Sequence, residues 1–137
     1  MGDWLVGPEY IPAPELEMVV GVPQGRIVQF VMNSADSAFY NGIARKEKGT
    51  VDPHNARTLI VNTFSQPYTR LVTVYVPSQY VEGTAIPFIV HHDGPKKPEG
   101  AETHMLPRVL NNLIHQQRVP PMVAILIANG GGDAQGS

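Results

Sequence analysis

The sequence predicts an α/β fold in which antiparallel N-terminal strands lead into a parallel βαβ unit. Alternating or β-branched segments lie between residues 25 and 77, and two nearly continuous apolar segments follow at 86–93 and 122–129. A helical pattern separates these two segments, which is the arrangement of parallel strands joined by a right-handed crossover. Only one helix is predicted, so we expect one face of the sheet to be bare.

The composition is that of one folded domain. The 137 residues are 42% hydrophobic and 16% charged, with a formal net charge of −2, and nothing in this balance suggests binding to nucleic acid or to a membrane surface. The absence of cysteine excludes disulfides and zinc–thiolate sites. The first residues lack a basic segment and an uninterrupted apolar segment, so no signal peptide is predicted.

Residues 1–25 are expected to form an extended N-terminal arm, and residues 26–137 the rest of the domain. The arm contains four prolines and has little periodicity. Its candidates for packing onto the domain are Trp4, Leu5 and Tyr10, because an aromatic side chain in such an arm usually serves this purpose.

The first predicted strand is "GRIVQFVMNS" (25–34), which alternates between two faces. The segments "ARTLIVNTF" (56–64) and "TRLVTVYVP" (69–77) are rich in β-branched residues, and we expect them to form an antiparallel pair that Pro77 ends. The polar segment "ARKEKGTVDPHNA" (44–56) is predicted to be a mobile surface loop.

The predicted helix lies in "LPRVLNNLIHQQR" (106–118). Apolar residues at helical spacing form one stripe, made of Leu106, Val109, Leu110, Leu113 and Ile114. Pro107 must lie in the first turn, and Pro120-Pro121 ends the helix. The flanking segments "IPFIVHHD" and "MVAILIAN" have the continuous apolar character of strands buried on both faces.

The segment with the most reactive side chains is "FIVHHDGP" (88–95). Its adjacent histidines point to opposite faces of a strand, so they do not readily bind one metal together. His91 and Asp93 share a face, but a metal site usually needs three or four converging ligands, and only His104 and His115 remain as candidates elsewhere. No full set is evident, so we predict no metal and no other cofactor.

No serine in the sequence lies between the two glycines of a G-x-S-x-G nucleophile elbow, so a His–Asp base would have no nucleophile to activate. The turn Asp93-Gly94-Pro95 follows a parallel strand, at the end of the sheet where α/β proteins bind ligands. Gly94 is expected to permit the turn and Pro95 to stiffen it. Such a loop can offer backbone N–H groups to an oxyanion, and the alternative is a connection without function.

Three segments, 21–40, 69–95 and 106–132, together resemble the front half of the enterochelin-esterase-like family of α/β-hydrolases, which is related to feruloyl esterases and mycolyltransferases. The resemblance implies the first half of an α/β-hydrolase sheet and a secreted or periplasmic serine esterase. Such an enzyme hydrolyses a small carboxylic ester through an acyl-enzyme and needs no cofactor.

Only the turn Asp93-Gly94-Pro95 carries over from the family, as the oxyanion-hole loop. The family's nucleophile, acid and histidine lie after the last strand of this sequence, so no catalytic residue is assigned to this chain, and we expect it to be inactive alone. His104 and His115 do not match the family histidine, which follows the nucleophile. His91 and His92 are candidates to face the substrate.

The alternative is a non-catalytic binding or assembly domain that pairs through an open edge strand. We expect that edge at "MVAILIAN" (122–129), where the missing C-terminal half or another chain would cover it. A metal-dependent domain built on His91 and Asp93 is a third hypothesis.

Overall fold

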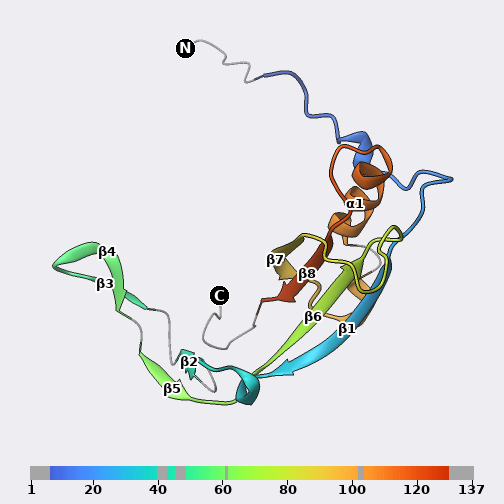
Figure 1. Ribbon diagram of the computed structural model, residues 1–137. Helices are drawn as coiled ribbons and strands as arrows, with labels where there is room; N and C mark the ends of the chain where they lie inside the picture. The colour runs from blue at the N-terminus through green and yellow to red at the C-terminus, as the bar shows by residue number, and fades with distance from the viewer. Residues whose placement is uncertain (1–6, 40–42, 46–48, 61, 102–103, 130–137) are drawn as a thin grey trace, which may run out of the picture.

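The computed structural model describes residues 7–39, 43–45, 49–60, 62–101 and 104–129 (Figure 1). Its elements, in chain order, are η1 (Pro14–Leu16), β1 (Arg26–Asn33), η2 (Ser34–Asp36), β2 (Ile43–Arg45), β3 (Thr50–Asp52), β4 (Asn55–Ile60), β5 (Thr63–Ser65), β6 (Thr69–Val76), β7 (Phe88–Gly94), η3 (Pro98–Gly100), α1 (Met105–His115) and β8 (Val123–Ala128).

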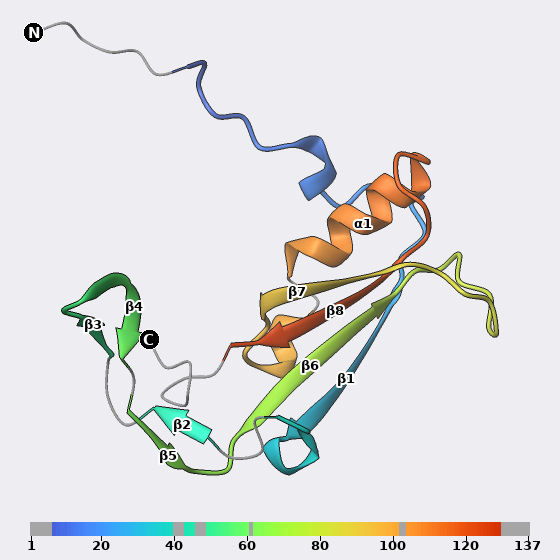
Figure 2. The ribbon, with the colours of Figure 1, turned by 60° about the vertical axis from the view of Figure 1, so that its left-hand side comes forward.

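Four of these strands form the central sheet, in the order β1-β6-β8-β7 (Figure 2). β6 lies antiparallel to both β1 and β8, whereas β7 and β8 are parallel and are joined through α1. The predicted fold class is therefore confirmed, since antiparallel N-terminal strands lead into a parallel βαβ unit.

β8 lies inside this sheet, so the open edge that we expected at 122–129 is wrong. β6 pairs with one side of β8 and β7 with the other, which leaves β1 and β7 as the two edges of the sheet described. The crossover through α1 brings β8 between β7 and β6 instead of beyond β7. β7 is thus not buried on both faces as predicted, and Phe88 and Val90 are 64% and 47% exposed.

The strand pairing expected within residues 56–77 is also wrong. β6 pairs with β1, from Arg26 opposite Val76 to Asn33 opposite Thr69. β4 instead pairs with β3, and β5 with β2, in two short ribbons that extend away from the sheet (Figure 1). The segment 44–56, predicted to be a loop, therefore contributes to strands. The turn between β3 and β4 is closed by the Asp52 side chain, whose Oδ1 accepts a hydrogen bond of 2.8 Å from the His54 backbone N–H.

One face of the sheet is covered by α1, which confirms the predicted apolar stripe. Leu110 and Ile114 of the helix pack against three residues of the sheet, namely Tyr75, Ala124 and Leu126. Polar groups on this face are paired: the Tyr75 hydroxyl donates to Asn111 Oδ1 at 2.8 Å. Burial raises the pKa of Tyr75 to about 12. None of the described helices is long and apolar enough to cross a membrane.

The opposite face is apolar, and we call it the bare face because no described helix covers it, as the single predicted helix led us to expect; its central Val72 is nevertheless buried by its neighbours. The register places rows of valine, isoleucine and phenylalanine side by side on it, for example Val28 beside Val74 and Val74 beside Ile125. Its outer strands are widely exposed, with Val28 at 46% and Phe30 at 53%. Among the described residues α1 is the one α-helix, and its core lies on the other face.

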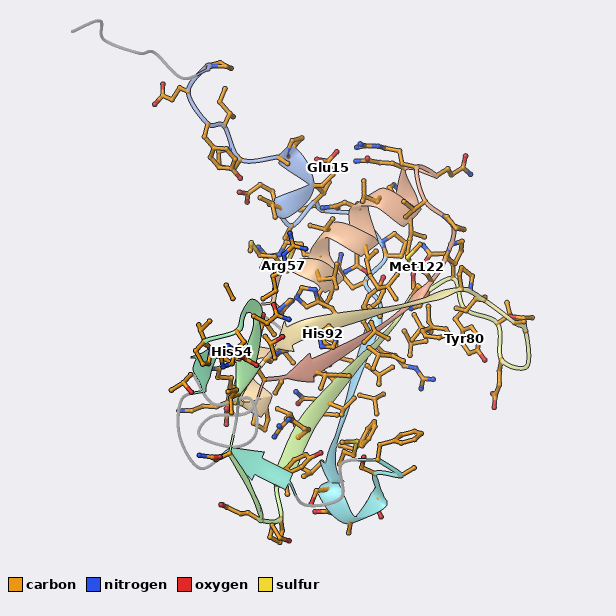
Figure 3. The ribbon with its side chains drawn as sticks, turned by 90° about the vertical axis from the view of Figure 1, so that its left-hand side faces the viewer. Glu15, His54, Arg57, Tyr80, His92 and Met122 are labelled. Carbon is orange, nitrogen blue, oxygen red and sulfur yellow. The ribbon has the colours of Figure 1, made fainter. Side chains whose placement is uncertain are left out.

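The described part of the N-terminal segment contacts α1 through polar groups, and the expected packing of Tyr10 is wrong. Tyr10 is 82% exposed, and Trp4 and Leu5 lie outside the described residues. The buried Asn112 side chain donates to the Glu15 and Glu17 carbonyl oxygens at 2.7 and 2.8 Å. Glu15, labelled beside the helix in Figure 3, forms an ion pair with Arg118. A hydrogen bond from its own backbone N–H, and then Arg118, lower the pKa of Glu15.

Candidate functional site

The candidate site is the turn Asp93-Gly94-Pro95, where β7 ends and the chain leads toward α1. Because β7 and β8 are parallel, their carboxyl ends are adjacent, and Asn129 follows β8 directly. Asn129 Nδ2 donates a hydrogen bond of 2.7 Å to Asp93 Oδ1, which joins the two strand ends. The predicted turn therefore lies at the end of the sheet where α/β proteins bind their ligands.

Asp93, rather than Gly94, has the left-handed backbone at this turn. Its φ is 64°, a conformation that aspartate tolerates better than most residues with a side chain. The register with β8 also shifts here, since His92 pairs with Ile127 and Gly94 with Ala128, while Asp93 has no partner residue. An extra residue of this kind bends a strand and redirects its backbone groups. Our expectation that Gly94 permits the turn was thus wrong.

Gly94 is needed for a different reason, which is its close approach to β8. A Cβ atom on Gly94 would lie 2.8 Å from the carbonyl carbon of Leu126 and 2.9 Å from the amide nitrogen of Ile127. Both are backbone atoms of the central parallel strand, so they do not move aside easily. Gly94 and Pro95 are buried, and Pro95 has no N–H to offer.

The structure brings together His91 and His104, which were named from the sequence only as candidates for an incomplete metal site. Their ring centroids lie 5.2 Å apart with an interplanar angle of 72°. His91 is half-buried on the face that α1 covers, and His104 is the N-cap residue of α1, whose Nδ1 accepts a hydrogen bond of 3.3 Å from the Leu106 N–H. The position of His104 just before the predicted helix was the available signal, but Ser, Thr, Asp and Asn are the usual caps.

Burial holds the pKa of His104 below its ordinary value, and the charge of the neighbouring His91 lowers it further. A hydrogen bond with the Asp93 backbone acts in the opposite direction and is the weaker effect. The imidazole of His104 is therefore stabilised in its neutral form, which is the form that can accept the hydrogen bond of the helix cap.

The other two histidines named from the sequence lie apart from this pair. His92 is exposed on the bare face of β7 (Figure 3), so the adjacent histidines do point to opposite faces as predicted. His115 is exposed in the last turn of α1, about 15 Å along the helix axis from the first turn. Among the described residues no three His, Asp or Glu side chains are placed to bind a metal ion together.

The arrangement offers a hydrogen-bonded turn with backbone polar groups, and no nucleophile adjoins it among the described residues. The described serines lie outside this turn, and none lies between the glycines of a nucleophile elbow. The chemistry available at the turn is therefore hydrogen bonding to an oxygen of a ligand by the backbone, with the His104 imidazole nearby.

No protein-family model and no curated protein matches this chain. Among solved structures, it is similar to a mutant of the feruloyl esterase module from Clostridium thermocellum complexed with sinapinate, with a TM-score of 0.50 and 17% identity. A structure of a protein designated FAE has a TM-score of 0.48 and 17% identity. Both matches cover 96% of this chain and 37% of the other, so this chain spans little more than a third of their length. The likeness to the module shows the fold, and the described chain forms a partial α/β fold with a mixed sheet.

Proposed function

We propose that this chain is the amino-terminal part of a serine esterase of the enterochelin-esterase-like kind. The observation that carries the proposal is the turn 93–95 at the carboxyl end of β7, in a sheet with the fold of an α/β-hydrolase. In that fold the connection after this strand supplies one of the two N–H donors of the oxyanion hole. The substrate class is a small carboxylic ester.

In the intact enzyme, a serine hydroxyl attacks the ester carbonyl, the alcohol leaves, and water hydrolyses the resulting acyl-enzyme. The negative charge that forms on the carbonyl oxygen accepts a hydrogen bond from the turn. Pro95 has no N–H, so the donor is Asp93 or Gly94. The exposed His92 faces the substrate, whereas His91 supports the turn from the side of α1.

The serine, its acid and its histidine come from sequence outside these 137 residues, which contain no G-x-S-x-G. The additional residues pair with the open edge of β7 and cover the bare face of the sheet. The chain alone is therefore inactive toward esters.

The test compares this chain with a longer one translated from the downstream reading frame. We expect the longer frame to contain G-x-S-x-G after a strand, and its product to cleave p-nitrophenyl acetate and butyrate until a fluorophosphonate inhibitor is added. The 137-residue chain should show no turnover above buffer. Inhibitor-sensitive turnover by the 137-residue chain, or a downstream frame without the elbow, would contradict the proposal.

The second candidate function is a binding or assembly domain, and the observation that favours it is the open edge of β7 beside the bare apolar face. Unpaired strand edges of this kind associate with other chains unless they are protected. Sedimentation equilibrium of this chain should then reveal a defined oligomer, which Val90→Lys on β7 dissociates and Lys97→Ala in the following loop does not. A chain that stays monomeric at about 100 μM would exclude self-assembly as this function, because its dissociation constant would then lie well above that concentration.

A further inference from the structure

His104 is held by contacts on three sides. Its Nδ1 accepts a hydrogen bond from the Leu106 N–H, and a second hydrogen bond joins the ring to the Asp93 backbone at the end of β7. Its ring also forms a T-shaped contact with the His91 ring. Asp93 in turn accepts a hydrogen bond from Asn129. These contacts connect both ends of the β7–α1 loop, residues 93–104, to the two parallel strands.

We propose that His104 is a pH-sensitive helix cap, which joins the first turn of α1 to the end of β7 while its imidazole is neutral and releases that turn when it is protonated. The reason is that protonation changes the number of hydrogen-bond donors and acceptors on the imidazole ring. A neutral imidazole has one N–H and one acceptor nitrogen, and the acceptor is Nδ1 because it receives the Leu106 N–H. A protonated imidazole has two N–H groups and no acceptor, so the cap at Leu106 is lost.

The electrostatic surroundings of His104 oppose its protonation. The facing titratable group on β7 is His91, whose positive charge disfavours a second one nearby. The Asp93 carboxylate, at the end of β7, accepts a hydrogen bond from Asn129 beyond β8. On α1, Arg108 donates to the Leu16 carbonyl oxygen at 3.1 Å. In the described part of the loop, the charged side chains are exposed and comprise Lys96, Lys97 and Glu99.

The direction of the effect follows from the lowered pKa of His104. Between its folded pKa and the ordinary value of about 6.5, the unfolded chain binds more protons at this residue than the folded chain does. Stability from the neutral cap is therefore fully present above about pH 6.5 and is lost as the pH falls through the folded pKa. The inference concerns the conformation of this chain and stands whether or not the loop serves an esterase.

The experiment follows amide hydrogen exchange and ¹H–¹⁵N spectra of the whole chain between pH 5 and 8. After correction for the intrinsic pH dependence of exchange, the Leu106 amide should become roughly five- to tenfold less protected at low pH, which is the effect of losing one helix cap. His104→Asn supplies a cap that does not titrate, so its Leu106 protection should not depend on pH. His91→Leu removes the facing charge and should move the midpoint to higher pH.

The matched control is His54→Asn, because His54 is exposed on the turn between β3 and β4 and its contact there uses the backbone N–H. This variant should behave like the parent chain. The proposal is overturned if His104→Asn keeps the pH dependence of the parent, or if Leu106 protection in the parent is constant. If His104→Asn fails to fold, the proposal is tested in the parent chain alone. The pH midpoint of the His104 Cε1 proton shift must then equal the pH midpoint at which the Leu106 amide loses protection, and different midpoints would overturn the proposal.

Discussion

The two faces of the central sheet differ in a way that hydrophobicity alone does not explain. The face under α1 includes polar residues such as Thr73, yet Thr73, Ala124 and Leu126 are fully buried. The opposite face consists of valine, isoleucine and phenylalanine along most of its length, yet Phe30 and Phe88 are 53% and 64% exposed. The more apolar face is thus the less buried one.

This difference shows that the residues of the covered face are chosen to pack and hydrogen-bond with particular neighbours, whereas those of the bare face share only their apolar character. On the covered face Gln29 Nε2 donates to Thr73 Oγ1 at 2.9 Å, so a polar pair is buried at little cost. An apolar surface as continuous as the bare face is typical of a surface that contacts another molecule or segment. Parallel strands are normally covered on both faces, which agrees with the proposal that further sequence completes this sheet.

The largest effect should come from Leu126→Ala on the covered face, compared with Val90→Ala on the bare face. Leu126 is 0% exposed in the core cluster, so its truncation leaves a cavity and should lower the free energy of unfolding by about 3 kcal/mol. Val90 is 47% exposed, and its truncation should cost about 1 kcal/mol or less. Urea denaturation followed by circular dichroism measures both. Equal losses would mean that the bare face is covered in solution.

A smaller loss, about 2 kcal/mol, is expected for Gly94→Ala because the added methyl group meets the β8 backbone at 2.8 Å. Gly100→Ala is the matched control in the same loop, since its nearest neighbour would be the Pro95 side chain at 3.4 Å. The comparison is made by denaturation and by the chemical shifts of Asp93 and Ala128. If both variants lost the same stability, the close approach of β7 and β8 at Gly94 would not be the cause.

Local patterns in the sequence predicted the strands of the central sheet and α1, but not β2 and β3. The stripe from Leu106 to Ile114 predicted α1, and the alternation after Gly25 predicted β1, because periodicity depends only on neighbours in the chain. The position of the turn 93–95 at the end of a parallel strand was predicted for the same reason. The fold class followed from the order of these elements.

What the sequence did not predict depends on contacts between distant residues. The pairing of β1 with β6 and the place of β8 inside the sheet are set by how the segments pack in space, and no periodicity encodes them. The contact of His91 with His104 and the left-handed Asp93 arise from the same packing. The position of the turn was thus found from the sequence, while the residues that hold its conformation were found from the structure.

Asn112→Ala, which removes the hydrogen bonds between α1 and the N-terminal segment, should also lower the free energy of unfolding. Asn112 is 2% exposed and donates to the Glu15 and Glu17 carbonyl oxygens, which would lose these partners. We expect a loss of about 1 kcal/mol, since the carbonyl groups can then bond to water, together with faster proteolysis between residues 7 and 22. His115→Ala, on the exposed side of the same helix, should change neither. An unchanged cleavage rate in Asn112→Ala would show that the N-terminal segment is held by other contacts.

The smallest effect on stability should come from Val90→Thr, and it gives the sharpest test of the bare face. Threonine has nearly the shape of valine, so the exchange replaces a methyl group by a hydroxyl group that water can reach on an exposed face. The free energy of unfolding of this chain should therefore change by less than about 0.5 kcal/mol. The same exchange on a covered face would bury an unpaired hydroxyl group at a cost of about 1–3 kcal/mol. The free energy of unfolding is therefore measured for Val90→Thr in this chain and in a longer chain that includes the downstream sequence. We expect no significant loss in the first and a clear loss in the second. Equal losses would mean that the added sequence does not cover this face.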